Sequence, residues 1–580
     1  MGSAGSVTHE WAGEAVGLAM RRRAPGHAAV DVLRANGVDV VFGLNGDHIL
    51  KLYEGLADTA AIRHVTVKHE NTAALAAEAY GRLTGRPGVA ICTAGPGALN
   101  AISGVASAYA AGAPVVQLTG AVPTGAALET FHGVDAVDFT ARAFAPVTKA
   151  SERVTRAQDI PAALTRAFAL AAAGRPGPVH VEITRDVLEG APFDTPPAVP
   201  APRPAAAPSP DLDRVLDRVR RARRPVMVAG KGAWYPVASA ALVAFAEALG
   251  APVAHTWDGH GAMPTVHPLS LGGYRGPQSH PAVLEELVAA DLVLGAGVRP
   301  GTEAARALES AAGGRLLLLH AADEPERAAD APDWPRISSV PALAATLRAL
   351  AEAVPESPAA GQARQVCAAA QRDLARGLAV ELARHAAARP WHVGLAIAAL
   401  SERLTPDTIV TTDVSNVKLW VPLQLRTFGP HSHVQAGSWG TMGYALPAAL
   451  GAAVAFPGRK VVALAGDASF LMSSSDLVTL VQHRLPVVVG VHHDGRIGMI
   501  EYMQTSIGRA PYATEVGEVD YARLAEAAGM PGIRVDVPAQ IGAAWDRALA
   551  EDGPILVELM AGHAFPRPSV RRFVEQAGQA

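Results

Sequence analysis

Two aspartates in the last third of the chain follow apolar, strand-like segments at matching positions. The pair Gly466-Asp467 comes directly after segment 460–465, and Asp494 comes shortly after segment 486–491. The carboxyl ends of neighbouring parallel strands meet at one edge of a sheet, where open α/β folds build their sites. Mg²⁺ takes about six oxygen ligands and is commonly held by one or two carboxylates together with phosphates. The two aspartates therefore predict a magnesium site beside a diphosphate, although a Gly-Asp pair after a strand is by itself an ordinary turn.

A third acid, Glu70, lies where a helix-like segment, 71–84, begins. A glutamate at that place is most often only a favourable partner of the helix dipole. The glycine-containing segments 81–88 and 93–97 and the nearby Asn100 follow it. The combination of these segments, and not Glu70 alone, supports a functional prediction.

The elements that must position these acids alternate between strand-like and helix-like segments. Apolar strands separated by helices predict parallel sheets that are covered on both faces. A length of 580 residues suggests about three domains. We therefore predict an α/β fold with three doubly wound parallel-sheet domains. The expected divisions are an N-terminal extension (1–24), a first domain (25–190), a Pro- and Ala-rich linker (191–210), a central domain (211–352), a linker helix (353–388), a third domain (389–562) and a C-terminal tail (563–580).

The composition is typical of a globular enzyme, with 49% apolar and 18% charged residues and a formal net charge of −4. No long basic block points to nucleic acid. No uncharged apolar run approaches the roughly 18–20 residues that cross a bilayer. Two cysteines, Cys92 and Cys367, exclude a cysteine-rich metal site and a disulfide framework. We expect a cytoplasmic protein that binds neither nucleic acid nor membrane.

Segment 466–499 resembles the diphosphate-binding motif of thiamine-diphosphate enzymes of the pyruvate oxidase and acetolactate synthase superfamily. The resemblance implies that Asp467 and Asp494 offer side chains to Mg²⁺ and that Arg496 offers its backbone carbonyl. Ala468 departs from the family pattern, which has glycine, and His493-Asp494 replaces Asn-Asn. Aspartate is a hard ligand, so its extra charge is expected to tighten magnesium binding and to weaken diphosphate binding slightly.

Residues 68–100 are densely similar to the same superfamily, which implies that Glu70 binds the aminopyrimidine ring of thiamine diphosphate. A protonated carboxyl there favours the imino tautomer, whose nitrogen removes the C2 proton of the thiazolium ring. Segment 440–443 resembles the part of the family that bends the cofactor, with Met442 as its support. The cofactor-binding residues implied in this way are Glu70, Gly95, Asn100, Gly440, Met442, Gly466, Asp467, Ala468, Ser469, Asp494, Arg496, Ile497, Gly498 and Met499.

The resemblance makes residues 25–190 a pyrimidine-binding domain and residues 389–562 a diphosphate-binding domain. These domains meet across a subunit interface in the family, so the resemblance implies a homodimer or homotetramer with active sites at subunit interfaces. In the central domain, the glycine turn 295–301 could hold ADP, as in some acyl-CoA relatives, or nothing. The arginine-containing tail, 563–580, is a candidate lid over the active site.

Further residues are candidates for acid–base work on a small-molecule substrate, although each alone is more typically a loop or surface group. Asp47 lies in a segment that resembles the Gly-Asp loop of pyruvate and indolepyruvate decarboxylases. Glu501 follows the diphosphate motif at about the place of an acid in several decarboxylases and lyases of the family. His132 stands where acetolactate synthases often have glutamine, and His48 and His492 are weaker candidates.

Asp47 and Glu501 favour a carbon–carbon lyase or decarboxylase, because the synthases typically lack acids at these positions. Such an enzyme would act on a 2-hydroxyacyl-CoA or a 2-oxo acid through a C2-thiazolium carbanion. The alternative is an acetolactate-synthase-like carboligase, in which the carbanion attacks a second acceptor. A non-catalytic homologue is a third interpretation, against which the presence of Glu70 argues.

Overall fold

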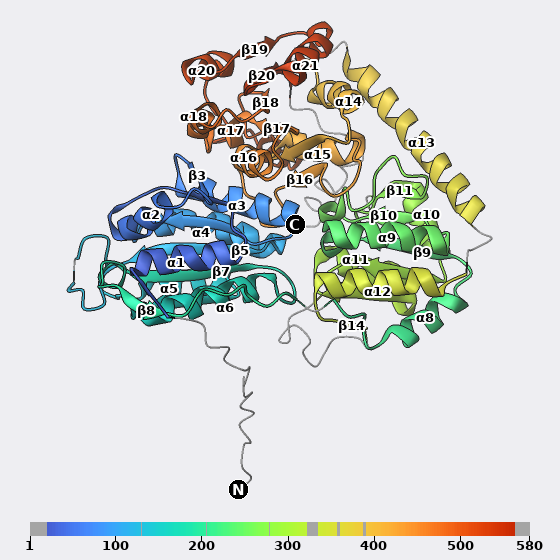
Figure 1. Cartoon of the computed structure of the whole chain (residues 1–580). Helices are drawn as coiled ribbons and strands as arrows, with labels where there is room; N and C mark the ends of the chain where they lie inside the picture. Colours follow the sequence, from blue (N-terminus) through green and yellow to red (C-terminus); the bar gives the residue numbers. More distant parts are fainter. Residues whose placement is uncertain are drawn as a thin grey trace.

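A computed structural model of the chain describes residues 20–128, 130–204, 206–277, 279–321, 334–355, 360–386 and 390–562. It contains three six-stranded sheets, each in its own domain, and Figure 1 shows these domains as separate bodies that meet near the centre. Every strand pair within the three sheets is parallel. The predicted α/β fold with three parallel-sheet domains is confirmed.

The first sheet has the strand order β3-β2-β4-β5-β7-β6. Val41 packs with one group of helices and the next residue, Phe42, packs with α3 on the other face, because successive side chains of a strand point to opposite faces. The strands are β2 (Val40–Gly43), β3 (Arg63–Thr66), β4 (Gly88–Cys92), β5 (Val115–Ala121), β6 (Ala150–Val154) and β7 (Pro178–Thr184). The helices are α1 (Pro25–Ala35), α2 (Leu50–Ala57), α3 (Glu70–Thr84), α4 (Pro96–Ala111), α5 (Phe139–Phe144), α6 (Ile160–Ala172) and α7 (Arg185–Leu188).

The central sheet has the order β11-β10-β9-β12-β13-β14. Its strands are β9 (Pro225–Ala229), β10 (Val253–His255), β11 (Ser270–Gly273), β12 (Leu292–Ala296), β13 (Leu316–Ala321) and β14 (Arg336–Ile337). Its helices are α8 (Leu212–Arg221), α9 (Pro236–Leu249), α10 (Pro281–Ala289), α11 (Glu303–Ala312) and α12 (Val340–Ala353). The long helix α13 (Ala360–Ala386) then runs along the outside from the central to the third domain (Figure 1).

The third sheet has the order β16-β15-β17-β18-β20-β19. Its strands are β15 (Thr408–Thr412), β16 (His433–Gln435), β17 (Lys460–Gly466), β18 (Val487–His493), β19 (Gly532–Val535) and β20 (Ile555–Met560). Its helices are α14 (Val393–Arg403), α15 (Asn416–Gln424), α16 (Ala445–Ala455), α17 (Asp467–Leu471), α18 (Leu477–Gln482), α19 (Gly498–Ser506), α20 (Tyr521–Ala527) and α21 (Ile541–Ala550).

The predicted N-terminal extension and the predicted linker together form a small sheet. Residues Arg21–Arg23, in the predicted extension, form β1, which pairs antiparallel with β8 (Phe193–Thr195) in the predicted linker. Proline cannot donate to a ladder, and β8 occupies the three residues between Pro192 and Pro196. The predicted lid, 563–580, lies outside the described residues.

Helices α3 and α16 join the first domain to the third. Gly451 in α16 faces the carbonyl of Ala76 in α3, and a Cβ atom added at Gly451 would lie 2.3 Å from that oxygen. Glycine therefore permits the close approach of the two helices. None of the helices within the described ranges is both long and apolar enough to cross a membrane.

Candidate active site

The two aspartates of the predicted metal site lie at the ends of adjacent strands. Gly466, the last residue of β17, is paired with His492 of β18, so Asp467 and Asp494 emerge side by side at the carboxyl edge of the sheet. The sequence predicts a helix that begins near Ser473 and faces the diphosphate. The structure has a 3₁₀ turn at Ser474–Asp476 that continues into α18 at Leu477, close to the predicted start, and it has an additional short helix, α17, that begins at Asp467.

Backbone amides fix the orientation of both carboxylates. The Asp467 carboxylate accepts hydrogen bonds from the backbone N–H groups of Gly495 at 2.6 Å and Ala468 at 2.7 Å. The Asp494 carboxylate accepts from the backbone N–H of Arg496 at 3.2 Å and from Asn416 Nδ2 at 3.2 Å. The carboxylates are therefore held in place by the fold itself.

The electrostatics and the donor set fit a divalent cation. Burial, followed by the negative charge of Asp494, raises the pKa of Asp467 to about 6. A cation between two such carboxylates would offset their repulsion. The Asn416 Oδ1 atom is also buried and has no hydrogen-bond partner within the described residues. An amide oxygen is a suitable magnesium ligand or can accept from a water on the ion, so these residues fit the predicted Mg²⁺ site.

Other residues of the predicted diphosphate segment surround this pair. The Ser469 hydroxyl donates to the backbone carbonyl of Val414 at 2.8 Å. The Arg496 guanidinium pairs with Glu515 at 3.1 Å, so that its side chain is engaged away from the aspartates. Helix α19 begins at Gly498 after Ile497, and Met499 lines a large cavity described below.

Glu70 is the first residue of α3 and is 7% exposed. The Asn100 side chain, from α4, donates to Glu70 Oε2 at 3.0 Å, so these two predicted cofactor residues are in contact. A Cβ atom added at Gly97 would lie 3.0 Å from Glu70 Oε1. The turn before α4 also needs glycine at Gly95, where φ is +58°. The glycines of segment 93–97 thus let the backbone approach the Glu70 carboxyl closely.

Segment 440–443 forms a turn between β16 and α16. Gly440 and Gly443 have φ values of +74° and +75°, which explains the glycine at both positions. Met442 is half-buried, and the Thr441 hydroxyl oxygen is buried without a hydrogen-bond partner among the described residues. An unpartnered buried hydroxyl beside the predicted cofactor-bending residues fits a missing ligand there.

The predicted acid–base residues belong to two separate domains. Asp47 lies in a short helical turn, and its carboxylate accepts from Arg185 at 2.6 Å. Glu501 accepts from the Thr514 hydroxyl at 3.3 Å. His132 has a left-handed backbone with φ of +66°, and its ring stacks on His48 with the centroids 4.9 Å apart. His492 Nε2 donates to the backbone carbonyl of Ala561 at 3.0 Å.

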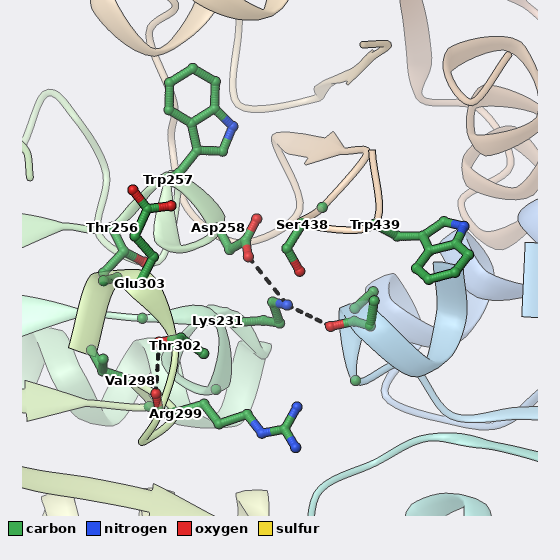
Figure 2. A pocket seen from close by; sticks show the side chains of 18 of the residues that line it. Lys231, Thr256, Trp257, Asp258, Val298, Arg299, Thr302, Glu303, Ser438 and Trp439 are labelled. Carbon is green, nitrogen blue, oxygen red and sulfur yellow. Dashed lines mark hydrogen bonds and ion pairs between the residues drawn. The ribbon is translucent and has the colours of Figure 1, made fainter. Parts of the chain in front are cut away.

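A cavity of about 880 Å³ opens where the three domains meet. Figure 2 shows Lys231, Asp258 and Arg299 of the central domain facing Ser438 and Trp439 of the third domain. The predicted glycine turn of the central domain lies on this wall. Gly440 and Met499 also line the cavity, which connects it to the cofactor segments of the third domain.

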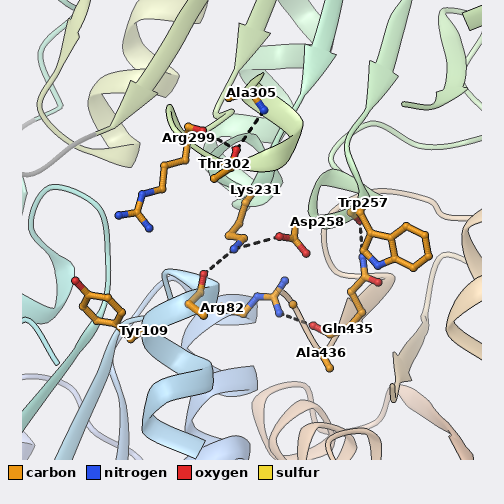
Figure 3. A network of polar contacts seen from close by, with 12 residues as sticks. Arg82, Tyr109, Lys231, Trp257, Asp258, Arg299, Thr302, Ala305, Gln435 and Ala436 are labelled. Carbon is orange, nitrogen blue, oxygen red and sulfur yellow. Dashed lines mark hydrogen bonds and ion pairs between the residues drawn. The ribbon is translucent and has the colours of Figure 1, made fainter. Parts of the chain in front are cut away.

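Buried charged side chains beside the cavity make hydrogen bonds between the same three domains. Lys231 Nζ donates to the backbone carbonyl of Ala110 at 2.6 Å and pairs with Asp258 at 3.2 Å. Arg82 of α3 pairs with Glu78 at 3.2 Å and donates to the Gln435 carbonyl at 3.0 Å (Figure 3). Burial lowers the pKa of Lys231, and the charge of Asp258 opposes that shift. Hydrogen bonds from Lys231 and Arg82 to backbone carbonyls of other domains therefore connect the three domains beside the cavity.

Comparison with known proteins identifies this architecture. Family models for thiamine pyrophosphate enzymes match the chain three times: the N-terminal TPP binding domain at residues 24–139, the central domain at 212–350 and the C-terminal TPP binding domain at 413–559. Over 94% of its length the chain is also 31% identical to an acetolactate synthase of Mycobacterium bovis, of which the match covers 89%. The chain belongs to the thiamine pyrophosphate enzyme family. Two further relatives are the acetolactate synthase isozyme 2 large subunit of Escherichia coli, 32% identical over 91% of the chain and 94% of that protein, and a probable acetolactate synthase large subunit of Methanocaldococcus jannaschii, 29% identical over 94% and 93%.

These relatives correct one prediction. The interpretation as a lyase or decarboxylase is wrong, because the thiamine pyrophosphate enzymes that match nearly the whole chain are acetolactate synthases. The interpretation depended on acids at Asp47 and Glu501, where the synthases typically have none. In the structure Asp47 is paired with Arg185, and Glu501 is held by Thr514. Isolated acids at two positions were weaker evidence than similarity along the chain.

Several site residues are not apparent from the sequence. Asn416, which contacts Asp494, follows the end of β15 and begins α15. The polar residues that follow β15 were the signal that could have found Asn416. Because β15 lies beside β17 in the sheet, its carboxyl end lies near Asp467. Lys231 and Asp258 give no comparable signal, since they lie in separate turns of the central domain and Lys231 also donates to Ala110 of the first domain.

Proposed function

We propose that the chain is an acetolactate-synthase-like carboligase that uses thiamine diphosphate and Mg²⁺. The observation that supports this most strongly is the 31–32% identity to acetolactate synthases over more than 90% of the chain. In the proposed reaction, one 2-oxo acid loses CO₂ and the remaining acyl unit is joined to the carbonyl carbon of a second 2-oxo acid. With pyruvate, two molecules and one proton give acetolactate and CO₂.

Each part of the predicted site has a role in this proposal. Bound thiamine diphosphate would supply the nucleophilic carbon and the electron sink for decarboxylation. Asp467, Asp494 and the Arg496 carbonyl would hold Mg²⁺, and Glu70 would hold a proton at the pyrimidine ring. Gly440 and Met442 would support the bent shape of the cofactor. The carboxylates are already oriented by backbone hydrogen bonds, which reduces the reorganisation that binding would require.

The active site is proposed to form between subunits of a homodimer or homotetramer. Within the described part of one chain, no hydrogen bond or ion pair joins Glu70 to Asp467. A second copy that places its third domain against Glu70 would complete the site. Sedimentation with and without thiamine diphosphate and Mg²⁺ tests this arrangement, and a catalytically active monomer would contradict it.

The cavity between the domains is the proposed place for a nucleotide such as ADP. Its volume of about 880 Å³ lies within the range of ligand sites, and Lys231, Arg299 and Trp257 offer positive charge and an aromatic surface. The charge of a diphosphate and the face of a purine would both be accommodated. Mass spectrometry of small molecules released from the purified protein would identify ADP, FAD or neither.

The decisive experiment for the function is a product assay with pyruvate. The purified chain, supplied with thiamine diphosphate and Mg²⁺, is expected to form acetolactate and CO₂ in equal amounts. Formation of acetaldehyde without acetolactate, or no turnover of any 2-oxo acid, would contradict the proposal. The Glu70→Gln variant serves as the inactive control, because the amide cannot donate the carboxyl proton.

A further inference from the structure

The loops that follow three neighbouring strands of the first sheet contain buried polar atoms that have no hydrogen-bond partner among the described residues. These strands are β2, β4 and β5, which are adjacent in the sheet. The atoms are His48 Nδ1, Thr93 Oγ1 and His132 Nδ1, and none has a hydrogen-bond partner within the described part of the chain, although His48 Nδ1 lies 3.9 Å from an Asp47 carboxylate oxygen. Buried polar atoms are almost always paired. Three unpaired atoms at one sheet edge therefore point to a ligand that binds there.

The two histidines form one unit. Their rings are nearly parallel, at 17°, with centroids 4.9 Å apart, and Phe131 stacks on His132 at 4.0 Å. His48 is 2% exposed. His132 adopts a left-handed backbone that residues other than glycine rarely adopt. Such backbone strain persists where the surroundings enforce it and is frequent at functional sites.

Close backbone contacts connect this pair to Glu70. A Cβ atom added at Gly95 would lie 2.5 Å from the His132 carbonyl oxygen, and one at Gly97 would lie 3.0 Å from Glu70 Oε1. Gly46, two residues before His48, is equally close to Thr93. The turn before α4 therefore touches the histidine pair on one side and the predicted cofactor glutamate on the other. A substrate bound near Glu70 would lie within reach of this edge.

Asp47 and His48 are adjacent in sequence but have different surroundings. Asp47 is 44% exposed at its side chain and pairs with Arg185 at 2.6 Å, whereas His48 is enclosed. Burial, followed by the nearby His132, lowers the pKa of His48, while Asp47 raises it and Arg185 lowers it. His48 is thus a neutral imidazole at pH 7, with one N–H to donate. Neutral donors suit a carbonyl oxygen better than a carboxylate, which a cation would bind more strongly.

We infer that His48, His132 and Thr93 form the subsite for the carbonyl oxygen of the acceptor substrate, the second 2-oxo acid of the reaction. The inference rests on the proposed carboligase function. When the acceptor's carbonyl carbon forms the new C–C bond, the π electron pair moves to the oxygen, which takes up one proton and becomes the product hydroxyl. Hydrogen bonds from this subsite stabilise the charge that grows on that oxygen.

The test compares two products of the same enzyme. In His48→Phe the ring stacking is kept and the N–H is lost. We expect the ratio of acetolactate to CO₂ to fall by roughly 10²-fold or more, the amount lost with one donor to a developing oxyanion. Release of CO₂ is expected to stay within about threefold of wild type, with acetaldehyde as the other product. Affinity for thiamine diphosphate, measured by titration calorimetry, should not change.

His27→Phe is the matched control, because His27 is a partly exposed histidine of the same domain that pairs with Asp58. It should keep the wild-type product ratio. If His48→Phe does not fold, Thr93→Val decides, since valine keeps the shape of threonine and lacks its hydroxyl. A folded variant of either kind with the wild-type ratio overturns the inference alone. A wild-type chain that forms no acetolactate overturns the proposed function, and the inference with it.

Discussion

Helix α3 carries two buried glutamates, two turns apart, whose surroundings differ. Glu78 is fully buried and pairs with Arg82, and the Tyr444 hydroxyl donates to its second oxygen. Burial raises the pKa of Glu78, and Arg82 and Tyr444 oppose that shift. Glu70 accepts one hydrogen bond, from Asn100, and a glycine turn passes beside its other oxygen. The Glu78 carboxylate has partners at both oxygens and stabilises the fold. The Glu70 carboxylate has one partner and is available to a ligand.

Replacing Glu70 by glutamine tests most directly whether Glu70, unlike Glu78, has a catalytic role. The amide oxygen can still accept from Asn100, so the fold should be kept, with thermal unfolding close to that of wild type. Loss of the acidic proton is expected to lower kcat by roughly 10²–10⁴-fold. Steady-state kinetics with pyruvate at saturating thiamine diphosphate measure the effect. A variant with near-normal kcat would show that Glu70 does not act on the cofactor.

Replacing Glu78 by alanine should have the opposite pattern, with a large loss of stability. Arg82 would be left buried without its carboxylate partner, which costs about 3–5 kcal/mol in comparable pairs. Denaturant unfolding followed by circular dichroism measures the change. The control is Glu54→Ala, which removes an exposed partner of Lys51 and should change stability by no more than about 1 kcal/mol. Equal stability of the two variants would contradict a structural role for Glu78.

A cluster of buried histidines near Arg82, the partner of Glu78, is expected to have a structural role as well. His260 and His433 contact each other through their Nδ1 atoms at 2.9 Å, and His255 lies beside them. Burial lowers the pKa of His255 to about 4 and that of His433 to about 3, and the charge of Arg82 adds to the shift at His433. The neutral rings therefore stabilise the fold above pH 6.5, and this stability is lost as the pH falls toward 4.

Between pH 7 and pH 5 the loss should be on the order of 2 kcal/mol per histidine. Urea unfolding at a series of pH values measures the slope. His433→Asn, which keeps a polar side chain that does not titrate, should flatten the profile between pH 6.5 and pH 4. A variant with the wild-type slope would show that this cluster does not control the acid sensitivity.

A smaller effect is expected from a substitution in the predicted metal site, which tests the functional role of the third domain. Asp494→Asn removes one negative charge and restores the amide that the family usually has there. We expect about tenfold weaker affinity for Mg²⁺, measured by activity against free Mg²⁺ after removal of metal with a chelator. Asp552→Asn, an exposed aspartate, is the control. Unchanged affinity in Asp494→Asn would contradict a contribution of the Asp494 charge to Mg²⁺ binding.

The sequence allowed the fold and the cofactor segments to be predicted because their signals are local. Asp467 and Asp494 follow apolar strands directly, and Glu70 stands at a helix start before a glycine turn. Glu78 gave no such signal, since a glutamate within a helix is usually exposed and its partner Tyr444 is distant in sequence. The pairing of Asp47 with Arg185 and the burial of His48 were not apparent for a similar reason: the direction of adjacent side chains in a short turn depends on tertiary packing.

The contact between Glu78 and Tyr444 spans 366 positions, which has a consequence for synthesis of the protein. While a ribosome is still making the last third of the chain, α3 lacks the surface of α16 that covers it. The first domain then emerges with Glu78 and its apolar neighbours open to water, and such surfaces favour association with other chains. The helix that holds Glu70 therefore reaches its final packing only after Tyr444 and α16 have left the ribosome.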